Sequence, residues 1–300
     1  MADHLAFSDI YAGVELAVKG ALGSKRDLIK LMINMVYLNE ILVADPLYPL
    51  FWLVKFDDSF STKAPATITN ITAASPPVIT AEAHGFVSGD IVSIHNVVGM
   101  TELNNRFFLV DDEDDDTFEL QDLDDTDIVG AGDTAYTSGG TAHHRGITPS
   151  VSIQSVLNAQ LLDEIQMTVI SREELMKDNT LWNENTARPE RWMHTKHFTT
   201  TGTETNRILF FKGADAAYRM QYWYLLRGSR LIEDTDVPLL PPEFHHTIVS
   251  GTVTRLIESN VQVENQIIWP GIYTSELNAL KTFNRKHYQD NEVRNKPFMI

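Results

Sequence analysis

The spacing of apolar residues predicts two helices near the start of the chain. Within residues 8–42, apolar side chains recur every three or four positions, which is the period of a helix with one buried face. The stretch LGSKRD interrupts this pattern, so we expect two core helices, the first capped by Ser8. Asp45-Pro46 ends the second helix, because a proline disfavours helix in the residue before it.

Three more helices are predicted in the second half of the chain. Residues 243–260 and 271–288 have helical spacing, and Pro242 stands in the first turn, where proline is favoured. Ser171 and Glu174 have the spacing of a capping box, in which each side chain bonds the backbone N–H of the other residue. We therefore expect a short helix over REELM.

Between the terminal helices the pattern indicates strands. Segment 66–145 has β-branched runs, alternation of apolar and polar residues, and turn residues between the runs. The stretches PLFWLVKF, RILFFKG and YRMQYWYLLRG also have the composition of strands. Residues 150–177 are ambiguous, because Leu157 and Leu161 have helical spacing in a stretch that also fits a strand.

This order of elements predicts an α+β fold with an insertion. Residues 1–65 and 146–300 are expected to form one discontinuous domain, a helical bundle with a small β-sheet region. Residues 66–145 are expected to form an inserted all-β domain, a small barrel or sandwich. Insertion at an exposed loop is tolerated when the ends of the inserted domain lie close together.

Composition excludes several classes of protein. The 300 residues include no cysteine, so a disulfide scaffold, a thiol nucleophile and a cysteine-ligated zinc are excluded. The N-terminal sequence lacks the basic start and apolar core of a signal peptide. No stretch approaches the roughly 18 apolar residues of a membrane span, so no membrane partner is expected.

Negative charge is concentrated in the predicted β domain. The whole chain has a net charge of −17, and residues 66–145 carry −13 of it, from fifteen acids and two bases. This excludes the basic footprint of a sequence-specific DNA-binding protein. If this domain lined a DNA channel, its charge would repel DNA and ease sliding.

The acidic run DDEDDDTFELQDLDDTD at 111–127 has two interpretations. A cation such as calcium is one, with Asp111, Asp112, Asp114 and Asp116 as candidate ligands. An EF-hand loop starting at Asp111 would need glycine at its sixth position, where this chain has Asp116. We favour the other interpretation, a hairpin with a polar turn at 111–116 and with Phe118 and Leu120 facing one side.

Other candidate chemistries are weaker. The histidine pairs at 143–144 and 245–246 and the His194–His197 spacing could ligate a metal, but surface or core histidines are the simpler interpretation. No nucleophile elbow, phosphate-binding loop or dinucleotide fingerprint occurs, so we expect neither an enzyme nor a cofactor. The aromatic residues of the predicted strand fit a sugar groove or, more simply, a core and a subunit interface formed by Tyr222, Trp223 and Tyr224.

Three stretches together resemble the head-to-tail adaptors of tailed bacteriophages, also called tail tubular protein A or head-completion adaptors. They are DLIKLMINMVYLNEILVADPLYPLFW, SREELMKDNTLWNENTARPERWM and YRMQYWYLLRGSRLIEDTDVPLLPPEFHHTIVSGTVTRLIE. The resemblance covers about residues 1–60 and 150–290. Each stretch by itself is common, whereas their order and spacing are more specific.

The resemblance implies a structural protein of the virion, made in the host cytoplasm and placed at the head-tail junction. It implies a homo-oligomeric, dodecameric ring between the portal protein and the tail nozzle or tail tube protein, through which genomic DNA passes without sequence-specific binding. Such a ring closes only if each subunit presents two complementary faces. The C-terminal segment is implied to dock on the portal, through Arg285, Lys286, Tyr288, Arg294, Lys296, Pro297, Phe298, Met299 and Ile300.

The β domain resembles small inserted domains of phage tail proteins, which are similar to a half-domain of ubiquitin-activating enzymes. Without a cysteine, the enzymatic role of that half-domain is not implied. Three alternatives stay open: a tail completion or stopper protein, a module that binds a glycan or a capsid decoration, and a calcium-dependent structural domain.

Overall fold

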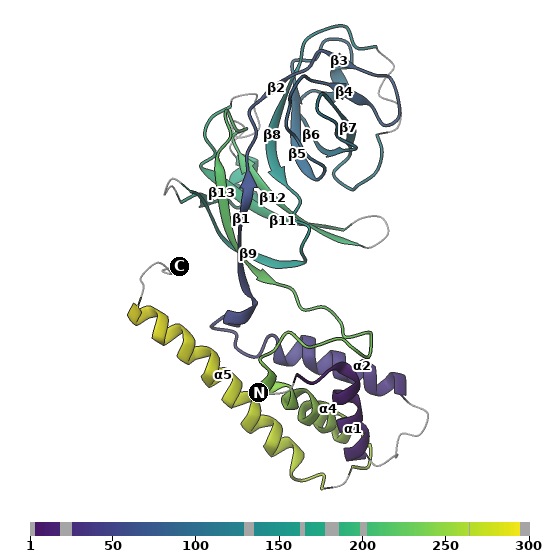
Figure 1. Ribbon diagram of the computed structural model, residues 1–300, viewed down its shortest axis with the longest axis vertical. Coiled ribbons are helices and arrows are strands. Elements are labelled where there is room, and N and C mark those ends of the chain that lie inside the picture. Colours follow the sequence, from purple (N-terminus) through teal and green to yellow (C-terminus); the bar gives the residue numbers. More distant parts are fainter. Residues whose placement is uncertain are drawn as a thin grey trace. The chain divides into compact units, whose positions relative to one another are not determined.

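The computed structural model (Figure 1) divides the chain into two compact units, Met1–Val54 with Arg227–Ile300 and Lys55–Leu226. It describes residues 4–18, 26–128, 135–162, 166–177, 186–198, 203–263 and 265–294.

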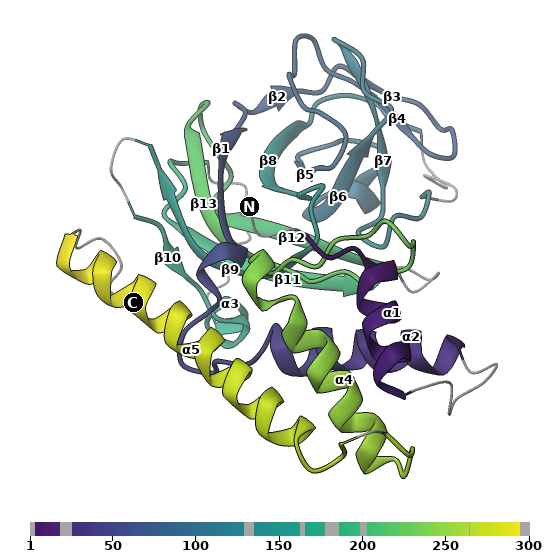
Figure 2. The same ribbon diagram turned by 60° about the horizontal axis from the view of Figure 1, so that its bottom comes forward.

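The first unit is built from helices that pack around α4. Its elements are α1 (Phe7–Val18), α2 (Arg26–Val36), the π-helical turn Tyr37–Ile41, the 3-10 turns Phe51–Leu53 and Pro242–Phe244, α4 (His246–Glu258) and α5 (Trp269–Arg294). Helix α4 contacts α1, α2 and α5, and Figure 2 shows it between them. Buried hydroxyl groups on α4 bond the preceding helical turn, as Thr252 Oγ1 does by donating to the Ile248 carbonyl at 2.7 Å.

The second unit contains two sheets. The smaller has three strands in the order β1 (Val54–Ser61), β13 (Arg219–Leu226) and β9 (Ile153–Leu161). The larger is a ten-stranded sheet in which β2 pairs with β8 and the others follow the order β10-β11-β12-β8-β5-β6-β7-β4-β3. Its strands are β2 (Ala66–Thr67), β3 (Asn70–Ile71), β4 (Val78–Thr80), β5 (Asp90–His95), β6 (Arg106–Asp111), β7 (Thr117–Gln121), β8 (Thr141–Ile147), β10 (Thr168–Val169), β11 (Arg191–Phe198) and β12 (Glu204–Phe211).

Strands β11 and β12 contribute apolar side chains to two cores, one on each face of their hairpin. On one face, Trp192 and Phe210 pack with Tyr222 and other residues of the three-stranded sheet. On the opposite face, Leu209 packs with Ile91 of β5 and other apolar residues. A third core lies within residues 66–142, between the strands of the acidic segment. The hairpin therefore joins the three-stranded sheet to the acidic part of the unit.

The predicted fold class is wrong. The described chain is predominantly β, with sheets of three and ten strands, and not a helical bundle with a small β-sheet region. The ambiguous segment contains the nine-residue strand β9, and β11, β12 and β13 each have eight residues. The physical reason is pairing between distant segments, since β8 joins β5 on one side and β12 on the other.

Several individual elements are confirmed. The predicted terminal helices correspond to α1, α2, α4 and α5, with ends that differ by a few residues. The short helix α3 (Arg172–Lys177) is present, and Ser171 caps it as expected. The backbone N–H of Ser171 donates to Glu174 Oε2 at 2.9 Å, and that of Glu174 donates to Ser171 Oγ at 3.2 Å. The domain boundaries at 65 and 146 stay a prediction.

Candidate functional site

The acidic run forms a hairpin, as predicted. Strands β6 and β7 pair in antiparallel register, with Val110 opposite Leu120 and Asp111 opposite Glu119. Phe118 and Leu120 are fully buried in the core of the acidic segment. Asp112 has a φ of 42°, a left-handed conformation that aspartate tolerates better than most residues. The local sequence therefore folds into a hairpin whose turn carries the acids.

The acids at this turn bond to neighbouring protein groups. Asp111 accepts a hydrogen bond from Gln121 Nε2 at 3.1 Å, and Asp116 accepts one from the Ala83 N–H at 2.9 Å. Glu113 accepts from the Ser88 hydroxyl, and this bond lowers the pKa of its carboxyl group. In contrast, burial and the charges of nearby aspartates raise the pKa of Glu119.

The candidate calcium ligands do not meet at one point. Asp111, Asp114 and Asp116 bond to different groups, with Asp114 accepting from the Asp115 N–H at 2.8 Å. Among the described residues, no three His, Asp or Glu side chains are grouped so that they could hold a metal ion. The hairpin gives the surface a dense negative charge.

A chain of buried polar side chains crosses β5 and β8. Arg145 Nε donates to Ser93 Oγ at 2.9 Å, and Ser93 Oγ lies 2.8 Å from His95 Nε2. His95 Nδ1 lies 3.0 Å from Asn105 Oδ1. Because Asn105 Oδ1 is an acceptor, His95 carries its proton on Nδ1 and accepts the Ser93 hydroxyl proton on Nε2. The order Ser–His–Asn resembles that of a catalytic triad.

This polar chain lacks the exposure that a nucleophile requires. Ser93 and His95 are each 1% exposed, and Arg145 is fully buried. A catalytic serine must reach a substrate carbonyl, and its hydroxyl is activated by a base rather than bonded to a cation. The hydrogen-bonded series Arg145–Ser93–His95–Asn105 is thus a satisfied buried network, which favours one register of β5 against β8. Sequence reasoning missed it, although Ser93 and His95 share one face of a strand.

His143 lies next to this network. Its ring is 4.8 Å from that of His95, measured between centroids. Burial, followed by the neighbouring His95 and Arg145, lowers the pKa of His143 to about 4. His143 is therefore neutral in the folded protein at pH values at which an unfolded histidine is already protonated.

We predict that acid destabilises the protein through His143. Its folded pKa of about 4 is below the ordinary histidine pKa of 6.5, so its contribution to stability is complete above pH 6.5 and is lost as the pH falls toward 4. Between pH 7 and pH 5, the free energy of unfolding should fall by about 2 kcal/mol from this residue. Urea titrations of the wild type and of His143→Gln measure the difference. Equal pH slopes for the two proteins would contradict the prediction.

The predicted portal-docking residues lie on or beyond α5. Arg285 pairs with Asp45, with Nε 2.7 Å from Oδ2, and this hydrogen bond lowers the pKa of Asp45. Tyr288 donates its hydroxyl to the Pro49 carbonyl at 2.8 Å, and Lys286 is exposed. Arg294 is in α5, and Lys296, Pro297, Phe298, Met299 and Ile300 lie outside the described residues. Arg285 and Tyr288 thus bind the protein's own loop.

The predicted interface residues on β13 differ in exposure. Tyr222 and Tyr224 are 2% and 8% exposed and belong to the core between the two sheets. The Tyr222 hydroxyl donates to Asp57 Oδ2 at 3.1 Å. Trp223 points to the other side of the strand and is half-buried. Of the three residues, only Trp223 has a side chain that could contact another subunit without rearrangement of this core.

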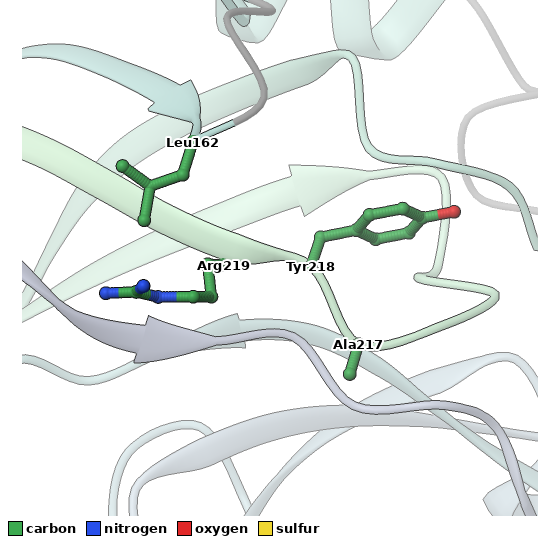
Figure 3. A pocket seen from close by; sticks show the side chains of 4 residues that line it. All are labelled: Leu162, Ala217, Tyr218 and Arg219. Carbon is green, nitrogen blue, oxygen red and sulfur yellow. The ribbon is translucent and has the colours of Figure 1, made fainter.

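Hollows occur on the described surface of each unit. One, of about 310 Å³, is lined by Leu162, Ala217, Tyr218 and Arg219 (Figure 3). The Tyr218 ring points away from Leu162 and Arg219 in this view, and its hydroxyl donates to Asp215 at 2.7 Å. The four lining residues that the structure describes provide no carboxylate, imidazole or serine hydroxyl, so they form no acid-base pair or nucleophile.

The second hollow, of about 300 Å³, lies in the helical unit. It is lined by Met32, Met35, Val36, Glu40, Arg255, Glu258 and Ser259. Arg255 binds Glu40 through both Nε and Nη2, each at 2.7 Å. Tyr273 donates its hydroxyl to Glu40 at 2.9 Å, and together these hydrogen bonds outweigh burial and lower the Glu40 pKa. The hollow therefore has an apolar side, formed by the two methionines and Val36, and a charged side, formed by the Arg255–Glu40 ion pair.

Comparison with known proteins yields one partial match. Residues 77–145 match the ubiquitin-activating enzyme E1 FCCH domain. No curated protein matches the chain. The likeness of the β domain to a half-domain of ubiquitin-activating enzymes is thereby confirmed over these residues. Among the described residues, no helix is both long and apolar enough to cross a membrane.

This match corrects the resemblance inferred from the sequence. The assignment to the head-to-tail adaptors of phages, with an inserted domain of phage tail proteins, is wrong, because the FCCH match and the predominantly β structure point to a different family. The motifs that suggested it were apolar helices and a proline-rich loop, which many folds share. The FCCH domain takes its name from ubiquitin-activating enzymes, but the domain alone does not show that this protein is a catalyst.

Proposed function

We propose that the chain is a structural protein that acts by assembling with further copies of itself. The observation that carries this proposal is the exposed apolar surface of the helical unit. Leu31 and Met35 on α2 are 51% and 48% exposed, and Ile267 before α5 is 95% exposed. Leu31 and Met35 are four residues apart and therefore adjacent on the helix surface, and an exposed apolar patch is typical of a protein-protein contact.

Helix α2 has apolar residues beyond those that the core covers. Ile29, Ile33 and Val36 face the core, whereas Leu28, Leu31 and Met35 are exposed beside them. The polar residues of α2 lie on its remaining side, so the apolar stripe is wider than the part buried by the described residues of the helical unit. The exposed part of this stripe is available to a partner.

A second copy is the partner that these features favour. The hollow beside Met32, Met35 and Arg255 is concave, and the segment at Ile267 and Ile268 offers apolar side chains that are 95% and 56% exposed. A projection and a hollow on one chain are the two complementary surfaces that a heterologous contact between copies requires.

Two features support a non-enzymatic role. The triad-like Ser93 and His95 are buried to 1% exposure, away from any substrate. The chain has no cysteine, so it has no thiol that could form a thioester. A place in a virion, beside portal and tail proteins and around DNA, stays a prediction, which copurification with a portal protein would test. A tail completion or stopper protein, and binding of a glycan or a capsid decoration by the β domain, stay alternatives.

The oligomeric state tests the assembly proposal. We expect native mass measurement of the purified chain to show one defined multimer, and Leu31→Glu or Ile267→Glu to weaken its association at least about tenfold, because each places a charge in an apolar contact. Ala279→Glu adds the same charge to an exposed position of α5 and serves as the control. Circular dichroism checks that all variants fold. A wild-type chain that stays monomeric at high concentration would refute self-assembly.

A further inference from the structure

Arg207 is a buried arginine on the face of β12 that continues from Leu209. Only 3% of its surface is exposed. Its register partner is Thr195 of β11, and Leu209, two residues further on, packs with Ile91. Because side chains two apart share a face of a strand, Arg207 extends from this apolar core toward the end of the hairpin.

One edge of the Arg207 guanidinium makes no hydrogen bond. Nε and Nη2 donate to no residue that the structure describes, and both atoms are buried. These two nitrogens form the fork that binds a carboxylate through two parallel hydrogen bonds. In the helical unit, Arg255 uses this fork to bind Glu40 and Arg285 uses it to bind Asp45. Arg207 has the same fork, but no carboxylate of the described residues is hydrogen-bonded to it.

Two further polar groups share this face. Thr205 lies two residues before Arg207 on β12. His197 of β11 is the register partner of Thr205. Thr205 Oγ1 and His197 Nε2 are buried and bond to no described residue. A hydroxyl and an imidazole N–H can each donate to an oxyanion. Three potential donors are thus arranged on one face of the hairpin.

The loop after β7 limits what this face can bind. Asp125 Oδ1 is 3.6 Å from Arg207 Nη2, which is an ion pair but too long for a hydrogen bond. The Asp125 side chain is 35% exposed and that of Arg207 is 3% exposed, so Asp125 separates the guanidinium from solvent on this side. Asp124 is close enough to His197 for the histidine to lower its pKa slightly, after the larger effect of the Thr126 hydroxyl. The negative charges of Asp124 and Asp125 should repel a phosphate dianion more strongly than they repel a carboxylate ligand with a single charge.

We propose that Arg207, Thr205 and His197 form a binding site for a carboxylate group. The fork of Arg207 would take both carboxylate oxygens, and Thr205 and His197 would donate to the same oxygens. The ligand is a free carboxylic acid or the carboxylate of a peptide. This inference is independent of the proposed self-assembly, since it concerns the sheet unit alone.

The Arg207 Nε–H signal in a ¹⁵N-correlation NMR spectrum tests the site directly. We expect acetate, or the peptide acetyl-Gly-Gly, to shift this signal saturably, while the amide of the same peptide does not. The signals of Arg255 and Arg285 are internal controls and should not move, because their forks are already occupied. Arg207→Lys identifies the signal by its loss. A response to acetate assigns the site to free acids, and a response only to the peptide acid assigns it to peptides.

A second variant keeps the test decisive if Arg207→Lys does not fold. Thr205→Val retains the shape of the side chain and removes its hydroxyl, and we expect it to weaken carboxylate binding about fivefold to tenfold. Phosphate should bind at least about tenfold more weakly than acetate. An Arg207 signal that moves with neither acetate nor the peptide, or that responds more strongly to phosphate, overturns the proposal.

Discussion

Replacing Trp192 by alanine is expected to lower the free energy of unfolding by about 3–5 kcal/mol. Trp192 is 1% exposed and packs with Ile208 and Tyr222 in the core between the two sheets. Its register partner on β12 is Phe210, which is fully buried. Alanine would leave a cavity between the two sheets. Because backbone hydrogen bonds keep each sheet rigid, the sheets can move together only in part to fill this cavity. The midpoint of a urea titration followed by circular dichroism measures the loss.

Trp192→Phe is the matched control for this prediction. It keeps an aromatic ring in the core and removes the indole N–H, which has no hydrogen-bond partner among the described residues. Its cost should therefore be clearly smaller than that of alanine. If Trp192→Ala left the urea midpoint unchanged, the packing of the two sheets against each other would be refuted.

Replacing Gly146 by valine is expected to destabilise the protein by about 3 kcal/mol, through overpacking. A Cβ atom at Gly146 would lie 2.6 Å from the Ile208 carbonyl oxygen and 3.2 Å from Leu209 Cα. Both are backbone atoms of β12, which pairs with β8 at this position. Because backbone cannot rotate away as a flexible side chain can, the substitution should force the two strands apart.

Gly271→Ala is the control for Gly146→Val. Nothing lies within 4 Å of a Cβ atom at Gly271, which is in helix α5. Alanine there should stabilise by about 0.5–1 kcal/mol, since glycine is a poor helix former. Thermal melting of both variants makes the comparison. A Gly146→Val protein that melts at the wild-type temperature would show that β8 and β12 do not pair closely.

The exposed and buried polar groups of this protein suit different roles. The acidic hairpin lies on the surface, where its charge can act on other molecules. The Ser93–His95–Asn105 chain is buried, where hydrogen bonding favours a single strand register. Composition alone makes both groups candidates for chemistry. Burial separates them, because a reactive group must meet its substrate.

Local patterns in the sequence were sufficient to determine local structure. The terminal helices, the capping box at Ser171 and Glu174, and the hairpin that carries the acidic run follow from spacing, capping and turn residues within short windows. The lack of cysteine likewise determined which covalent chemistry is absent. These properties depend on neighbours along the chain, so a pattern of apolar and polar residues specifies them.

Only the tertiary structure decided the fold class and the candidate sites. The pairing of β8 with β12 joins the acidic strands to the later strands in one sheet, and the apolar pattern of neither strand specifies that partner. The aromatic strand β13 alternates in the sequence, but only packing against Trp192 shows that Tyr222 faces the core. The surroundings of the Arg207 fork, which is ion-paired with Asp125 but makes no hydrogen bond, depend on contacts between β12 and a loop about eighty residues earlier. Such contacts are set by the three-dimensional arrangement of distant segments, which a local pattern does not encode.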